Sequence, residues 1–305
     1  MIRHVAVGNI NLDIYVVVDH IPGPDEDATA LELYIGPGGA AANYAVAVAR
    51  LGHEAHLVGH LGIGGLGAFL LDKLKENGVR IDHLIVHEDK QPGIVVILVS
   101  KNGERSMATM RGANALLKGD EADMDADVLH IASREPEIVR RATEHIRAKF
   151  VSYDPGGRVA RRYGSKAVEE IVDAIDLVAV NRVEAEHVLG SSDPTSLVKS
   201  LRGRLSYILL KQGSKGAILV TREGYYLVEA YTGGRVVDTT GAGDVFIAAF
   251  NSYFVERGDI ITALRAASIA AGLKVTRRGA QSAPTREEIE KRLREGKPEV
   301  RFSKL

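Results

Sequence analysis

The chain has 305 residues, of which 45% are hydrophobic, and its 39 basic side chains nearly balance 40 acidic ones. This length allows one large domain with an appendage, and the interleaved charges exclude the basic stripe that nucleic-acid binding requires. The sequence contains no cysteine, which excludes disulfides, Cys-based zinc sites and thiol nucleophiles. We therefore expect no nucleic-acid partner, and chemistry based on His and carboxylate side chains.

The first ten residues begin directly with a strand-like run, and no apolar stretch long enough to span a membrane follows them. We expect a soluble, cytoplasmic protein with no membrane partner. Eight Asn and three Gln stand against the many charged residues, a balance typical of proteins that avoid thermolabile amides and favour ion pairs. We interpret this balance as a sign of a thermophilic source.

Strand-like apolar runs alternate with helix-like periodic stretches along the chain. The predicted strands are 5–8, 55–58, 128–131, 150–153, 177–180, 207–211 and 217–220, and the predicted helices are 40–51, 68–77, 135–149, two stretches after residue 241, and 286–297. This alternation indicates βαβ units with right-handed crossovers. It predicts an α/β fold with a mostly parallel central sheet and helices on both faces.

Two excursions interrupt the alternation, at about 12–35 and 91–112, and each carries two strand-like runs. The second pair of runs flanks Asn102-Gly103, which is the strongest short-range signal for a β-hairpin. We predict that both excursions form a small separate sheet attached to a single domain over residues 1–305. That sheet is either a lid over a cleft or merely an extra sheet.

The most informative segment is Asp238-Thr239-Thr240-Gly241-Ala242-Gly243-Asp244, which leads into the apolar helical run 245–254. Small residues before a helix leave backbone N–H groups free and direct the positive end of the helix dipole at one point. A carboxylate in the first turn of that helix could take a proton from an attacking hydroxyl. The alternative is an ordinary strand-to-helix turn in which Asp244 only favours the dipole.

This string resembles the C-terminal signature of the ribokinase family, the phosphofructokinase-B-type carbohydrate kinases. The run Gly36-Pro37-Gly38-Gly39-Ala40-Ala41-Ala42-Asn43 is similar to the N-terminal signature of the same family, and the likeness continues through 8–13, 103–105, 111–114 and 275–281. The resemblance implies a ribokinase-like fold and transfer of a nucleotide's terminal phosphate to a sugar hydroxyl. It also implies that Asp244 is the catalytic base, and that the backbone of Gly241, Ala242 and Gly243 forms the anion hole.

The resemblance further implies an acceptor site near the N-terminus. Short amides and carboxylates suit ring hydroxyls, and glycines let the backbone approach a small polyol. Taken singly, Asn43 could be a helix cap and Asp13 a surface turn. The implied sugar-binding residues are Asn11, Asp13, Gly38, Gly39 and Asn43.

The nucleotide side is implied by three further likenesses. Asn181-Arg182-Val183-Glu184 is similar to an Asn-x-x-Glu element that orders water around magnesium, although Glu184 could also be the start of a surface helix. The segment 211–216 looks like the family's nucleotide loop, or a plain hairpin turn. The implied nucleotide-binding residues are Asn181, Glu184, Lys211, Gly213, Gly216 and Ser268, and the resemblance implies that a monovalent cation such as potassium binds at Asp238, Thr240 and Gly279.

One segment departs from the family and suggests a rival function. Val58-Gly59-His60-Leu61-Gly62-Ile63-Gly64 stands where the family usually has an element that ends in two acids. The overlapping run Gly62-Ile63-Gly64-Gly65-Leu66-Gly67 matches the GxGxxG fingerprint of NAD-dependent oxidoreductases. The acid that this fingerprint requires about 20 residues later would be Asp82, which is not at the end of a strand. A non-catalytic sugar-binding protein on the same fold is a second rival, against which the presence of Asp244 argues.

The sequence is compatible with several acceptors and with two donors. Short polar side chains without an aromatic cluster favour a ribose-like sugar, whereas a nucleoside could stack on Tyr15, Tyr34 or Tyr44. A sugar 1-phosphate needs a cationic clamp, for which Arg105, Arg111 and Arg134 are available. The donor is ATP or ADP, and the exposed edge of the small sheet suggests a homodimer through the lid.

Overall fold

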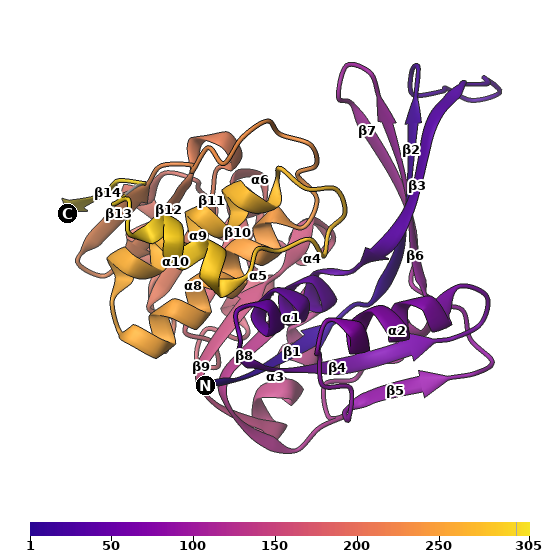
Figure 1. Ribbon diagram of the computed structural model, residues 1–305. Coiled ribbons are helices and arrows are strands. Elements are labelled where there is room, and N and C mark those ends of the chain that lie inside the picture. Colours follow the sequence, from indigo (N-terminus) through magenta and orange to yellow (C-terminus); the bar gives the residue numbers. More distant parts are fainter. Residues whose placement is uncertain (297) are drawn as a thin grey trace.

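The computed structural model describes residues 1–296 and 298–305, and its strands form two sheets (Figure 1). The larger has ten strands in the order β14-β13-β12-β11-β10-β9-β8-β1-β4-β5. Neighbouring strands are parallel from β5 to β11 and antiparallel from β11 to β14. Its strands are β1 (Arg3–Gly8), β4 (Glu54–Gly62), β5 (Leu84–His87), β8 (Met124–Ala132), β9 (Ile146–Asp154), β10 (Leu177–Asn181), β11 (Tyr207–Lys211), β12 (Ala217–Thr221), β13 (Gly224–Val228) and β14 (Val300–Lys304).

Helices cover both faces of this sheet, as predicted, because alternate residues of each strand point to opposite faces. In β10, Leu177 and Ala179 join one buried apolar cluster, while Val178 and Val180 join the other. Helices α1 (Ala40–Arg50), α2 (Gly67–Glu76), α8 (Ala242–Arg257), α9 (Ile260–Lys274) and α10 (Arg286–Leu293) pack in the first cluster, and α3 (Pro136–His145), α4 (Gly156–Tyr163), α5 (Lys166–Glu169), α6 (Arg182–Val188) and α7 (Pro194–Leu197) pack in the second. Over the described part of the chain, no helix has the length and apolarity needed to cross a membrane.

The smaller sheet has four strands in the order β3-β2-β6-β7 and projects from the body of the molecule (Figure 1). It consists of β2 (Asn11–Val18), β3 (Ala30–Gly38), β6 (Gly93–Ser100) and β7 (Arg105–Met110). Strands β6 and β7 form an antiparallel hairpin whose turn contains Gly103 with a φ of 88°, as the Asn-Gly pair predicts. The separate sheet expected from the two excursions is therefore confirmed.

The base of the small sheet lies where several predicted acceptor residues meet. Asn11 pairs with Gly38 on one side and with Gly93 on the other, and Asp13 pairs with Gly36. A side chain at Gly38 would overlap the Asp13 carboxylate. The register thus places Asn11 and Asp13 at the junction between the small sheet and the main body.

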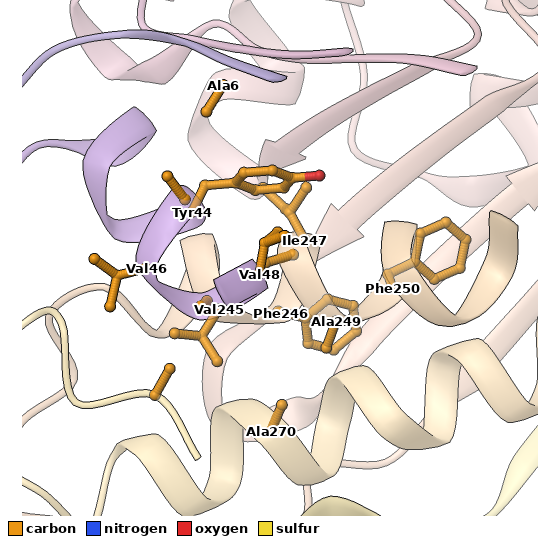
Figure 2. Close-up of a cluster of buried hydrophobic side chains, with 14 of the residues drawn as sticks. Ala6, Tyr44, Val46, Val48, Val245, Phe246, Ile247, Ala249, Phe250 and Ala270 are labelled. Atoms are coloured by element: carbon orange, nitrogen blue, oxygen red, sulfur yellow. The ribbon is translucent and has the colours of Figure 1, made fainter. Parts of the chain in front are cut away.

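Helices α1 and α8 pack against each other in the core between residues far apart in sequence. Figure 2 shows Tyr44 and Val48 of α1 beside Val245 and Ile247 of α8, and these residues belong to one buried cluster. The Tyr44 hydroxyl also accepts a hydrogen bond from the Asn251 side chain of α8, at 3.1 Å. This packing holds the beginning of α1 next to the beginning of α8.

Some predicted boundaries were wrong at the edges of the elements. The helix predicted over 135–149 ends at His145, because residues from Ile146 onward pair along β8 and form the first half of β9. The C-terminal helix ends at Leu293, and the predicted end at residue 297 lies outside the described residues. Strands β5, β13 and β14 were not predicted, and the short 3₁₀ turns are η1 (Gly112–Leu116), η2 (Val198–Ser200) and η3 (Gly213–Lys215).

Candidate active site

The loop before α8 combines a left-handed residue with a helix N-terminus. Gly241 caps α8 with a φ of 74°, and a Cβ there would lie 2.5 Å from the Ala280 carbonyl oxygen. Only glycine fits both constraints. The first turn of a helix leaves backbone N–H groups without intrahelical acceptors, so Ala242 and Gly243 begin a site suited to an anion.

Asp244 lies in this first turn, next to the acceptor-side helix. The Asn43 side-chain amide donates a hydrogen bond to Asp244 Oδ2 at 2.8 Å, and the two residues are 201 positions apart in the sequence. Burial raises the pKa of the Asp244 carboxyl to about 7, although the hydrogen bond from Asn43 opposes this shift. A carboxylate with that pKa can accept a proton near neutral pH.

Asp13 is a second carboxylate of the same cleft. Its side chain is 6% exposed, and burial followed by the negative charges of Asp244 and Asp238 raises its pKa to about 7. Within the described residues, no side chain or backbone group donates a hydrogen bond to it, and no cation lies within ion-pair distance. Asp13 and Asp244 therefore lie close enough for the charge of one to act on the other, and the Asp13 oxygens have no donor within the described residues.

Asn11 is held in place by Asn114, a residue of η1 that is 1% exposed. The Asn114 amide donates to Asn11 Oδ1 at 2.9 Å and to the Ile10 carbonyl at 3.0 Å, and its oxygen accepts from the Ile10 N–H at 2.9 Å. Gly93 lies against both side chains, so closely that a Cβ there would overlap them. The predicted acceptor residues Asn11, Asp13, Gly38, Gly39 and Asn43 thus lie around the base of the small sheet and the start of α1.

An apolar cavity of about 380 Å³ lies on the other side of the α8 N-terminus. It is lined by Gly213 and Gly216 of the β11–β12 connection and by Ser268 of α9. The Ser268 hydroxyl donates to the Glu229 carbonyl and accepts from the Tyr231 N–H, so it holds the cavity wall. The segment 211–216 is both a connection between antiparallel strands and part of this cavity.

A second cavity of about 550 Å³ adjoins the first at Lys211 and Gly213, and it contains Asn181 and Glu184. Glu184 is buried, and it forms a capping box with Asn181 at the start of α6. The Lys211 ammonium lies 2.5 Å from Asp154 Oδ2, and a Cβ at Gly243 would be 3.6 Å from Lys211 Nζ. The positively charged Lys211 side chain therefore lies between the two cavities, beside the loop before α8.

These acidic groups and Lys211 influence each other's protonation. Burial raises the pKa of the Glu184 carboxyl, and the negative charge of Asp154 raises it further. Burial disfavours the charged form of Lys211, but the attraction of Asp154 and Glu184 outweighs it and raises the pKa of the ammonium. Lys211 therefore remains charged at neutral pH.

Residues 1–287 match the family described as pfkB family carbohydrate kinase. The chain belongs to this family. The kinase is 32% identical over 298 residues to a protein of Halopiger xanaduensis described as ATP-dependent ribose-1-phosphate kinase, with 95% of this chain and 97% of the relative covered. It is 28% identical over 301 residues to the ribokinase of Haemophilus influenzae, with 93% and 95% covered.

Solved structures agree with this assignment. The ribokinase of Thermotoga maritima superimposes with a TM-score of 0.82 at 29% identity, covering 96% of this kinase and 100% of that chain. The ribokinase of Arabidopsis thaliana complexed with ribose and ATP gives a TM-score of 0.78 at 26% identity, covering 95% and 98%. The resemblance, the α/β fold with a small added sheet, and the prediction of a carbohydrate kinase are confirmed.

The region predicted to bind a monovalent cation already contains a positive charge. Lys274 is fully buried, and its ammonium donates to the Asp238 carbonyl at 2.8 Å and lies 3.8 Å from Asp238 Oδ2. The Asp238 carboxylate accepts from the N–H groups of Thr240 and Gly279, both at 2.9 Å. The Lys274 ammonium thus takes the Asp238 carbonyl oxygen, in the region where the sequence predicts a monovalent cation.

The glycine-rich segment 62–67 has a packing role in this kinase. A Cβ at Gly62 would overlap the carbonyl oxygens of Lys90 and Gln91, and one at Gly67 would overlap the Gly62 carbonyl. The Gly64 N–H donates to the Lys90 carbonyl at 3.1 Å. Close approach of the 90–91 backbone explains the glycines, and the family membership decides against the NAD-dependent oxidoreductase.

Three polar residues of the cleft were not recognised from the sequence. Asp154 ends the parallel strand β9, an edge at which ligands of open α/β sheets bind, and that position is a usable signal. Asn114 lies in η1 after the antiparallel strand β7, within the family-like segment 111–114, but no role was predicted for it from the sequence. Lys274 lies in an otherwise apolar helix face of α9, which gives no indication of its partner. Their roles depend on neighbours that are distant in the chain.

Proposed function

We propose that this kinase transfers the terminal phosphate of ATP to a hydroxyl of a ribose-type sugar, with Asp244 as the general base. The observation that carries the proposal is Asp244 itself, whose carboxyl has a pKa raised to about 7. It lies at the N-terminus of α8 and accepts a hydrogen bond from Asn43 of the acceptor-side helix. A base and an anion site therefore adjoin the residues predicted to bind sugar.

In the proposed reaction, the acceptor oxygen forms a bond to the terminal phosphorus while the bond from phosphorus to the bridging oxygen breaks, and ADP leaves. The hydroxyl proton goes to the Asp244 carboxylate. The N–H groups of the loop from Gly241 to Gly243 stabilise the charge on the transferred group. Asn11, Asp13 and the backbone at Gly38 and Gly39 hold the sugar, since short polar groups and bare backbone suit ring hydroxyls.

The choice of ATP as donor is supported by the cavities and by the relatives. The apolar cavity beside Ser268 suits a nucleoside, and Lys211 lies between it and the anion site, where phosphates would lie. The Halopiger xanaduensis relative is described as ATP-dependent, and the Arabidopsis thaliana ribokinase was solved with ribose and ATP. The name of the first relative gives ribose 1-phosphate as its acceptor, whereas the second was solved with ribose.

A magnesium ion accompanying the nucleotide fits the residues present only in part. Among the described residues, no group of three or more His, Asp or Glu side chains could hold a metal ion. Glu184 would therefore hold magnesium through water, together with the nucleotide phosphates. Bound magnesium would supply neutralisation of phosphate charge, and Lys211 contributes a second positive charge from the chain.

The small sheet is proposed to act as a lid. Its strand β7 contacts the loop before α8, because Arg105 donates a hydrogen bond to the Thr239 hydroxyl at 3.1 Å. Glu32 of β3 forms an ion pair with Arg278 at 3.0 Å. Leu33 is 63% and Met107 is 67% exposed, so apolar side chains of this sheet remain uncovered. We propose that a second copy covers them in a homodimer, and sedimentation showing only monomer at micromolar concentration would contradict that part.

The base assignment is tested with Asp244→Asn in a coupled phosphotransfer assay with ATP or ADP as donor. The variant should lose about a hundredfold or more in kcat, while nucleotide binding stays within about twofold. Asn43→Ala should lower kcat by a smaller factor, because Asn43 orients the carboxylate and does not accept the proton. A loss below about threefold in Asp244→Asn, equivalent to under roughly 0.7 kcal/mol of barrier, would exclude Asp244 as the base.

A further inference from the structure

Arg134 is the first side chain after β8 that carries a charge, and it is 0% exposed. Its Nη2 donates to Asn9 Oδ1 at 2.5 Å and to the Asn114 carbonyl at 3.0 Å. The other two donors of the guanidinium, Nε and Nη1, are buried and have no partner within the described residues. A buried charge with unpaired donors is costly unless something else completes its shell.

No carboxylate of the described chain neutralises this guanidinium. Glu135, which follows it directly, lies 2.8 Å from Arg158 and 3.5 Å from Arg111, so two other arginines share it. Burial is the main cause that lowers the pKa of Arg134, to about 10, and Arg111 lowers it further, yet the group keeps its charge at neutral pH. The charges of Glu135 and Glu121 favour the charged form of Arg134 from a distance, but within the described residues neither carboxylate forms an ion pair with it.

The backbone at this position is held in an unusual conformation. Ser133 has a φ of 57°, in the left-handed region that residues with a side chain rarely adopt. The Tyr153 hydroxyl donates to the Arg134 carbonyl at 2.7 Å. Strain of this kind persists only where the surroundings enforce it, so the backbone that carries Arg134 is held in one conformation.

Arg134 borders the acceptor residues through two of its own partners. The carbonyl of Asn9 lies against Gly39, the residue that precedes α1, so closely that a Cβ there would overlap it. Asn114, the other partner, holds Asn11. A continuous set of contacts therefore runs from Arg134 through Asn9 and α1 to Asn43, which binds Asp244 at the opposite end.

The other arginines available for a clamp have partners. Arg111 pairs with Glu135, and Arg105 donates to Thr239 on the nucleotide side of the cleft. Of the three arginines that the sequence offers, Arg134 is the one that is buried, borders the acceptor residues and keeps free donors. Arginine is suited to phosphate because its planar donors match two phosphate oxygens.

We propose that the acceptor is a phosphorylated pentose whose phosphate group is bound by Arg134 while its free hydroxyl faces Asp244. This inference rests on the proposed kinase function and narrows its substrate class. The reaction then converts a pentose monophosphate and ATP into a pentose bisphosphate and ADP. The new bond joins the acceptor oxygen to the terminal phosphorus, and the hydroxyl proton passes to Asp244.

The test measures kcat/KM with ATP for ribose, ribose 1-phosphate and ribose 5-phosphate. The wild type should prefer one of the two phosphates over ribose by at least about tenfold, and the product identifies which carbon carries the phosphate. Arg134→Gln should lower kcat/KM for that phosphate by about 10- to 100-fold and lower the value for ribose by a clearly smaller factor, since the same side chain also holds Asn114. Arg134→Lys keeps the positive charge but not the planar set of donors, so its kcat/KM for the phosphate should lie between the values of the wild type and Arg134→Gln.

Arg158→Gln is the matched control, because it removes a nearby exposed arginine that pairs with Glu135 and does not border the acceptor residues. It should leave the preference for the phosphate unchanged. A wild type that prefers ribose to both phosphates would overturn the proposal. So would an Arg134→Gln variant that loses ribose and sugar phosphates equally, since that pattern describes a structural arginine.

Direct binding separates this proposal from the kinase proposal. Calorimetric titration of the nucleotide-free wild type should show ribose 1-phosphate or ribose 5-phosphate binding at least about tenfold tighter than ribose, and the difference should shrink with added salt. Such binding without phosphotransfer to any sugar would refute the kinase function and leave the anion site standing. Equal binding of ribose and both phosphates would refute the anion site, whatever the variant does.

Discussion

Within the described residues, the buried charges on the nucleotide side of the cleft have oppositely charged partners, whereas Asp13 and Arg134 on the acceptor side have none within ion-pair distance. On the nucleotide side, Lys211 lies 2.5 Å from Asp154, and the Lys274 ammonium donates to the Asp238 carbonyl. On the acceptor side, within the described residues, Asp13 accepts no hydrogen bond and lies near no cation. Arg134 likewise has no carboxylate within ion-pair distance.

The difference separates parts of the site that are complete from parts that a ligand completes. A paired buried charge offsets its desolvation inside the protein and holds the loops around it. An unpaired buried charge makes the ligand-free protein less stable. A bound molecule of opposite charge can pair with it and so stabilise the folded state. The charge pairs of the nucleotide side are therefore formed before any ligand binds, whereas the charged groups of the acceptor side gain their partners when the sugar binds.

The largest effect should come from breaking a pair on the nucleotide side. Lys211→Met leaves Asp154 and Glu184 as adjacent acids beside the site of the donor phosphates, and we expect kcat to fall about a hundredfold. Steady-state kinetics with ATP measure this, with Lys166→Met, an exposed lysine of α5, as the control. A variant within about threefold of wild type would show that the pair is only structural.

Replacing the second cation should make the kinase depend on an external ion. Lys274→Met removes the ammonium at Asp238, so kcat should fall about tenfold in potassium-free buffer and recover when potassium chloride is added. The wild type should respond to potassium by less than about twofold. If the wild type itself requires potassium, Lys274 does not replace the ion.

Glu184 should act through hydrated magnesium rather than through the sugar. Glu184→Gln is expected to raise the magnesium concentration for half-maximal rate by about five- to tenfold, because one carboxylate charge is lost. The KM for the acceptor should not change. Glu186→Gln, an exposed acid on the same helix, is the control, and an equal shift in both variants would rule out a specific role.

The smallest effect concerns stability and its dependence on pH. The Asp244 carboxyl has a folded pKa of about 7, above the unfolded value near 3.8, so both states are protonated below pH 4. As pH rises from 4 through 7, the unfolded state loses its proton first, and the stability present at low pH is lost. Asp244→Asn should therefore raise Tm by about 3 °C at pH 8 and hardly change it at pH 4.

Scanning calorimetry at the two pH values measures this difference, and Asp89→Asn on the exposed surface is the control. The same pKa predicts that kcat/KM of the wild type rises with pH and levels off above about 7, because the base must be ionised. A Tm gain that is equal at both pH values would mean that ionisation of the buried Asp244 carboxyl does not destabilise the folded state.

Local sequence was sufficient to predict the parts of this kinase that are formed within a single turn or at the start of a single helix. The Asn102-Gly103 hairpin, the loop from Asp238 to Asp244 and the start of α1 at Gly39 were all predicted in place, because each depends on residues next to each other. The family resemblance followed from the same two glycine-rich segments. The alternation of strands and helices indicated the parallel sheet for a similar reason.

The pairing of charges was decided only by the tertiary structure. Asp154 and Lys211 end strands on either side of β10, so the strand order brings them together, and nothing near either residue in sequence indicates it. The helix predicted through residue 149 failed because pairing with β8 overrides local periodicity from Ile146 onward. In the sequence Arg134 is one arginine among many. Its burial without an ion-pair partner among the described residues results from the packing of distant segments, which only the tertiary structure imposes.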